Sequence, residues 1–76
     1  MDEKILKVLE EINEEIVSYN GSNMFEDGII DSFQVMDLVA DLEDELDIEI
    51  DAKYVVEENF KTKEDIINLI SMIMEE

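Results

Sequence analysis

Apolar residues return every three or four positions in the first part of the chain, a spacing typical of an amphipathic helix. The apolar side consists of Ile5, Leu9, Ile12 and Ile16. The opposite side consists of Glu10, Glu11, Glu14 and Glu15. This pattern predicts a helix from about Asp2 to Ser18, which turn-forming residues at positions 19–23 bring to an end.

The segment 20–30 lacks a helical pattern and is predicted to be a fairly long loop. It still contains large apolar side chains, namely Met24, Phe25, Ile29 and Ile30. We therefore expect parts of this loop to pack into the core rather than to lie free in solvent.

The second helix carries three start signals at one boundary. Asp31 is a good N-cap, since its carboxylate can accept hydrogen bonds from free backbone N–H groups. Gln34 then falls at the third helical position, which gives a capping box of the form D-x-x-Q. Ile30 and Val35 occupy the two positions of a hydrophobic staple. The stripe predicted to be buried consists of Val35, Leu38, Val39, Leu42 and Leu46.

The last third of the chain is predicted to contain one short and one long helix. Residues 47–52 alternate apolar and acidic, but a single strand has no partner here, so we expect an ordered loop. A short helix or 3₁₀ turn should follow around Lys53 to Glu58. Thr62 opens the last helix, with Asp65 at its third position. Its apolar face consists of Ile66, Ile67, Ile70, Ile73 and Met74.

These elements predict an all-α fold, a small four-helix bundle with three main helices and one short helix. One domain is expected to span residues 1–76, since no linker or repeat divides the sequence. The predicted core consists of Ile5, Leu9, Ile12, Ile16, Val35, Val39, Leu42, Ile66 and Ile70.

The charge of the chain restricts the partners that it can bind. Twenty-three acidic residues face five lysines, so the net charge is -18. Residues 8–52 hold fifteen of the acids and no base. Such a surface repels nucleic acid and anionic lipid and attracts basic protein surfaces. No apolar run is long enough for a membrane span, and the N-terminus lacks a signal-peptide layout, so we expect a cytoplasmic protein.

The residue inventory is poor in catalytic groups. The chain has no Cys, so it has neither a disulfide nor a thiol nucleophile of its own. It also has no His, the usual general base near neutral pH. We therefore expect a protein that is not an enzyme.

The residues around Ser32 resemble a known family. Residues 27–33 read DGIIDSF, which is similar to the attachment motif of phosphopantetheine carrier proteins, with its D-S-L core or a close variant. Residues 32–50 read SFQVMDLVADLEDELDIEI, similar to the acidic recognition helix of acyl carrier proteins. Phe60-Lys61-Thr62 before the last helix also resembles the family. The likeness covers essentially the whole chain.

The resemblance implies an acyl or aminoacyl carrier of the acyl carrier protein type. Ser32 would carry a covalent 4′-phosphopantetheine arm derived from coenzyme A, with Asp31 as the helix cap and motif residue. The implied partners are a phosphopantetheinyl transferase and loading and processing enzymes with basic docking surfaces. The carrier would act as a monomer and hold acyl groups as thioesters.

The chemistry of the site agrees with this implication. With Asp31 as N-cap, Ser32 is the first helical residue, and its hydroxyl lies at the edge of the domain. A phosphodiester there would lie near the positive end of the helix. The arm would also supply the thiol that the chain lacks. From the local sequence alone, an ordinary first-turn serine is the more common case, and it is the whole-chain resemblance that favours attachment.

The outer face of the second helix is a candidate docking surface. It combines the apolar residues Phe33, Met36 and Ala40 with the acids Asp37, Asp41 and Asp44. Large apolar side chains on a solvent face, flanked by charge, are typical of an interaction site. The alternative is that Phe33 or Met36 folds back over the loop into the core. For Phe33 the two alternatives are evenly matched.

Two other functions stay open at this point. One is a non-covalent acidic adaptor that binds a basic partner through the same helix. The other is a metal-buffering protein, since Asp47, Glu49 and Asp51 alternate, although they lack the glycine and terminal glutamate of an EF-hand loop. No specific metal site is predicted.

The cargo is also open. Phe33 stands where fatty-acid carriers usually have leucine, so a D-alanyl or specialised biosynthetic carrier is at least as consistent with the motif as a fatty-acid carrier.

Overall fold

Helices from both halves of the chain surround one apolar core in the computed structural model, which describes residues 2–75. The longer helices are α1 (Asp2–Ile12), α3 (Ser32–Leu46) and α4 (Lys63–Glu75). The shorter ones are α2 (Glu14–Ser18) and the 3₁₀ turns η1 (Ala52–Tyr54) and η2 (Glu57–Asn59). Within residues 2–75 no strand is formed, and the predicted all-α bundle is confirmed.

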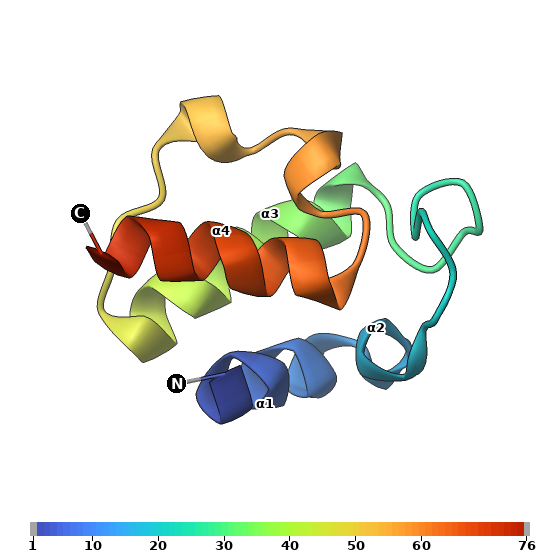
Figure 1. Cartoon of the computed structure of the whole chain (residues 1–76), viewed down its shortest axis with the longest axis horizontal. Coiled ribbons are helices and arrows are strands. Elements are labelled where there is room, and N and C mark those ends of the chain that lie inside the picture. The colour runs from blue at the N-terminus through green and yellow to red at the C-terminus, as the bar shows by residue number, and fades with distance from the viewer. Residues whose placement is uncertain (1, 76) are drawn as a thin grey trace.

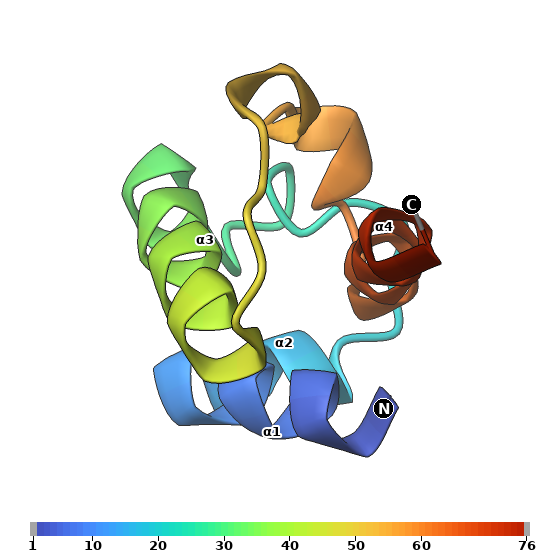
Figure 2. The same ribbon diagram turned by 90° about the vertical axis from the view of Figure 1, so that its left-hand side faces the viewer.

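The helices enclose the core from several sides. Figure 2 shows α3 and α4 on opposite sides of the molecule, with α1 and α2 across one end and the η1–η2 segment across the other. Figure 1 shows the loop between α2 and α3 at the remaining side, where it leads into the start of α3. The fully buried side chains are Ile5, Leu9, Ile16, Met24, Leu38, Leu42, Phe60, Ile66 and Ile70.

The first helix is broken, so the prediction of one helix from Asp2 to Ser18 is wrong. Asn13 leaves the helical conformation, with φ −160° and ψ 105°, and its side chain accepts a hydrogen bond from the backbone N–H of Glu15 (3.0 Å). Asn competes with helical hydrogen bonds in this way because its short amide reaches nearby backbone groups. Asn13 therefore ends α1 and caps α2.

The predicted core is correct except at two positions. Ile12 and Val39 are only partly buried, although both pack against the core. Ile12 lies next to the break at Asn13, and Val39 borders a surface groove. Met24 and Phe60 lie outside regular helices, yet both are fully buried. The expectation that the 20–30 loop packs into the core is thus confirmed.

The connection after α3 is an ordered loop, as predicted. Asp47 ends α3 in the left-handed conformation with φ 53°. Ile50 is buried, and its backbone N–H donates to Glu43 Oε2 (2.8 Å). The predicted short helix consists of two 3₁₀ turns rather than one, and the side-chain amide of Asn59 donates to the carbonyl of Tyr54 (2.8 Å).

The start of α4 follows the prediction, and so does most of its apolar face, since Ile66 and Ile70 are buried and Ile67 and Ile73 pack against the core. Thr62 Oγ1 accepts a hydrogen bond from the N–H of Asp65 (3.2 Å), which caps the helix. The Lys63 ammonium donates to the carbonyl of Val17 and so joins α4 to the end of α2. Two residues differ from the predicted face. Leu69, which was not included, is buried, whereas Met74, which was included, is 38% exposed because it lies near the end of the helix, beyond the core.

Candidate functional site

Ser32 is the first residue of α3, and its side chain is exposed. The preceding residue, Asp31, has extended backbone angles and accepts a hydrogen bond from the N–H of Gln34 (3.0 Å) through Oδ1. The predicted N-cap is therefore confirmed. Ile30 and Val35 are both buried, as a hydrophobic staple requires. The serine hydroxyl thus stands at a capped and packed helix start, close to the positive end of the helix dipole.

The second half of the predicted capping box takes a different form. The side chain of Gln34 accepts a hydrogen bond from Asn13 Nδ2 (3.3 Å). The same Nδ2 also donates to the carbonyl of Ile29 (3.0 Å). The first turn of α3 is therefore tied to the break between α1 and α2, a connection that the local sequence does not reveal.

The loop before Ser32 is held by Tyr19. Its hydroxyl donates to Asp27 Oδ2 (2.5 Å) and accepts from the N–H of Asn23 (2.8 Å). The hydrogen bond to Asp27 raises the pKa of Tyr19 above its ordinary value, because the bond favours the protonated phenol. The ring lies over Gly21 so closely that a Cβ atom there would be 2.3 Å from the Tyr19 hydroxyl oxygen. Gly28 adopts the left-handed φ of 74°, which a glycine tolerates readily.

The outer face of α3 carries the six residues predicted to form the docking surface. Phe33 is 77% exposed and Met36 is 67% exposed, so neither side chain folds back into the core. The other four, Asp37, Ala40, Asp41 and Asp44, are exposed as well. Their spacing of three and four residues places them on one side of the helix. Two large apolar side chains are thus displayed in an acidic surround.

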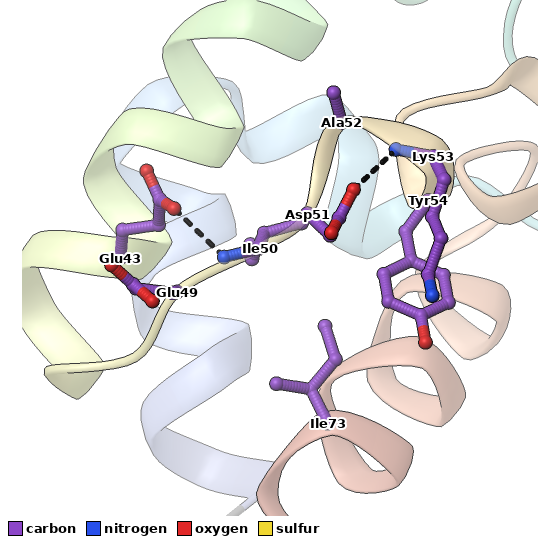
Figure 3. A pocket seen from close by; sticks show the side chains of 8 residues that line it. All are labelled: Glu43, Glu49, Ile50, Asp51, Ala52, Lys53, Tyr54 and Ile73. Carbon is purple, nitrogen blue, oxygen red and sulfur yellow. Dashed lines mark hydrogen bonds between the residues drawn. The ribbon is translucent and has the colours of Figure 1, made fainter.

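An acidic pocket of ≈ 490 Å³ lies at the opposite end of α3. Figure 3 shows that it lies between the end of α3, the 49–54 segment and Ile73 of α4. Glu43 and Asp51 are already occupied, since they accept from the backbone N–H groups of Ile50 and Lys53. The Lys53 ammonium lies 5.1 Å from the centre of the Tyr54 ring. In the part of the chain that the structure describes, no group of three or more His, Cys, Asp or Glu side chains is arranged to hold a metal ion.

A comparison with protein families shows which family the chain belongs to. Residues 3–70 match the family described as "Phosphopantetheine attachment site". The chain belongs to this family of carrier proteins. Its cofactor is therefore covalently attached 4′-phosphopantetheine.

Curated relatives of this carrier are D-alanyl carrier proteins. The one from Listeria welshimeri is 30% identical over 73 residues, which cover 93% of this chain and 94% of the relative. The one from Listeria monocytogenes serotype 4b matches to the same extent. The one from Bacillus cereus strain B4264 is 44% identical over 50 residues, which cover 63% of each chain. No solved structure matches the chain.

The surface around the start of α3 and along its side has two hollows. A pocket of ≈ 460 Å³ lies beside the helix start, lined by Phe25, Gly28, Ile29, Ile30, Asp31 and Gln34. A second, mainly apolar groove of ≈ 330 Å³ runs next to α3, lined by Met36, Val39, Ala40, Glu43, Ile50, Ala52 and Val55. The groove was not predicted from the sequence. Val39 was expected in the core, and the lining residues after α3 show no regular spacing of apolar positions. Among residues 2–75, none of the helices is long and apolar enough to cross a membrane.

Proposed function

We propose that Ser32 is the attachment site of the 4′-phosphopantetheine arm. The observation that carries this proposal is an exposed serine at the first position of a helix, directly behind a capping aspartate, in a chain of the phosphopantetheine family. The other serines lack this setting. Ser18 ends α2, Ser22 lies in the loop, and Ser71 lies inside α4.

The attachment is a transfer from coenzyme A. The Ser32 oxygen forms a bond to the phosphorus that bears the pantetheine arm, and the bond from that phosphorus to the bridging oxygen of the pyrophosphate breaks. Adenosine 3′,5′-bisphosphate leaves with the bonding electron pair, and the hydroxyl proton passes to a base on the transferase. The chain contributes an accessible hydroxyl, and the N-terminus of α3 favours the negative charge of the new phosphodiester.

The outer face of α3 is the surface through which the transferase and the loading enzymes bind. Asp37, Asp41 and Asp44 would attract basic partner surfaces and accelerate association. Phe33, Met36 and Ala40 would supply the apolar contact. These partners carry out the bond-making chemistry, and the carrier holds the cargo. We propose that it does so as a monomer in the cytoplasm, with residues 1–76 forming one domain.

The cargo that the comparisons favour is a D-alanyl group, held as a thioester on the arm. The support comes from the D-alanyl carrier proteins to which the chain is similar over nearly its full length. The thiol must come from the arm, since the chain has no Cys.

The first experiment tests the attachment site. The protein is incubated with coenzyme A and a broad-specificity phosphopantetheinyl transferase, and tandem mass spectrometry locates the adduct. We expect one phosphopantetheinyl group on Ser32 in the parent and in the Ser22→Ala control, and none in Ser32→Ala. Helicity should be unchanged in Ser32→Ala, because Asp31 still provides the cap. An unmodified parent, under conditions that convert a known carrier, would overturn the proposal in favour of the acidic adaptor.

The second experiment tests the cargo. The modified protein is incubated with ATP, labelled D-alanine and a D-alanine-activating ligase, with L-alanine and a fatty acid plus its own ligase as parallel arms. We expect label from D-alanine on the protein, and hydroxylamine should release it as it does any thioester. Loading with the fatty acid alone would leave the carrier role intact and overturn the D-alanyl assignment.

A further inference from the structure

Asn13 is bonded to residues on both sides of Ser32. Its Nδ2 donates to the carbonyl of Ile29, three residues before the serine (3.0 Å), and to Oε1 of Gln34, two residues after it (3.3 Å). These bonds join groups that are 16 and 21 residues apart in the sequence. The side chain therefore bridges the helix break to both ends of the attachment turn, residues 29–34.

The attachment turn needs such a support. Its first residues end a loop that runs from residue 19 to residue 31 without regular helix, and ordering such a segment costs conformational entropy. A nucleophile that is held in one orientation reacts faster once it is bound, because less freedom is lost on the way to the transition state. Asp31 fixes the N–H of Gln34, and the burial of Ile30 and Val35 holds the turn against the core. The side-chain bonds of Asn13 add a polar connection from the turn to the start of α2.

We propose that Asn13 is a positioning residue for the modification of Ser32, through its tether to Ile29 and Gln34. This proposal rests on the proposed attachment at Ser32. Asn13 does not touch the reacting atoms. It acts by holding the turn that presents the hydroxyl to the transferase, so that the bound complex starts close to the geometry of attack.

The two roles of Asn13 reside on different atoms, and one substitution separates them. Oδ1 caps α2 by accepting from the N–H of Glu15, whereas Nδ2 makes both bonds to the attachment turn. Asn13→Asp keeps an acceptor for the cap, and aspartate is as good an N-cap as asparagine. It removes both donors and places a negative charge beside two acceptor oxygens. The cap is retained while the tether is lost.

The test is the steady-state kinetics of modification by the transferase, with Ile5→Val as the matched control. Ile5 lies in α1, the helix that Asn13 ends, and its side chain is fully buried in the core, so its truncation lowers stability without removing a bond to the turn. We expect kcat to fall about 10- to 100-fold in Asn13→Asp, with KM changed less than about twofold. Ile5→Val should keep the parental kcat at a temperature where all the variants are folded.

A second measurement checks the cause. Hydrogen exchange should become faster at the amides of residues 29–34 in Asn13→Asp, while the amides of α4 exchange as in the parent. Gln34→Met removes one of the two tethers and leaves the α2 cap intact, so its kcat should fall less than that of Asn13→Asp. This variant keeps the proposal testable if Asn13→Asp does not fold.

The outcomes are distinct from those for the attachment site itself. If the parent is not modified at all, the proposed function fails. If the parent is modified and Asn13→Asp and Gln34→Met react with the parental kcat, the attachment site stands and the positioning role is wrong. A fall in kcat that Ile5→Val shares to the same degree would also overturn the positioning role, since the effect would then be one of stability.

Discussion

The two sides of α3 differ in their surroundings, since one packs in the core and the other is exposed to solvent. The inner side buries Val35, Leu38, Leu42 and Leu46 against the other helices. The outer side displays Phe33 and Met36 to solvent among acidic residues. Apolar residues therefore occur on both sides, and hydrophobicity alone does not distinguish the core from the proposed docking surface. What distinguishes them is the neighbouring charge, since acids accompany the apolar residues on the outer side only.

The largest effect is expected on stability, from a truncation on the inner side of α3. Leu42→Ala should lower the free energy of unfolding by roughly 2–5 kcal/mol, because Leu42 is fully buried and its removal leaves a cavity. Met36→Ala, a truncation on the outer side, should change it by less than about 0.5 kcal/mol. Urea denaturation of both variants measures the difference. Equal midpoints for the two variants would show that the two sides do not differ in their contribution to stability.

A smaller effect is expected from the outer side. Asp41→Lys should raise the KM of the transferase for the carrier about 3- to 10-fold, because the charge that attracts a basic partner is reversed. Added salt should reduce the difference in KM between the variant and the parent, since it screens the attraction. Glu10→Lys makes the same charge change on the exposed side of α1 and should leave KM near the parental value. If both reversals raise KM equally, net charge matters and the outer side of α3 is not a specific docking surface.

The smallest effect is expected from the charge of the whole chain. With a net charge of -18, the acids repel one another, and salt or millimolar calcium should raise the Tm by about 2–5 °C relative to dilute neutral buffer. The double variant Glu10→Lys/Asp41→Lys carries less negative charge, so salt or calcium should raise its Tm by a smaller amount. Thermal melting followed by circular dichroism gives both values. A parent whose Tm ignores salt and calcium would show that the carboxylates are too far apart to destabilise the fold.

The start signals of α3 and α4, which depend on neighbours in the sequence, were predicted correctly. The cap at Asp31 and the staple at Ile30 and Val35 involve residues within one turn, so the local sequence is sufficient to identify them. The same holds for the cap that Thr62 provides to α4. The position of Ser32 at the start of α3 followed from these signals.

Features that depend on distant partners were missed. The pattern of apolar residues continues through Asn13, and the break there is stabilised by bonds to Ile29 and Gln34, which the periodicity cannot indicate. Met24 and Phe60 are buried from irregular segments, where there is no period to interpret. The groove beside α3 has the same origin, since three of its seven lining residues, Ile50, Ala52 and Val55, come from the segment after the helix.

The cap at Asp31 has a consequence for how the loaded carrier is distinguished from the empty one. The bond from the Asp31 carboxylate to the N–H of Gln34 passes over Ser32 and makes no use of its hydroxyl. Attachment at Ser32, as proposed above, would therefore leave this capping bond in place. A partner enzyme that must select one state would then find the difference in the arm and its cargo rather than in this cap.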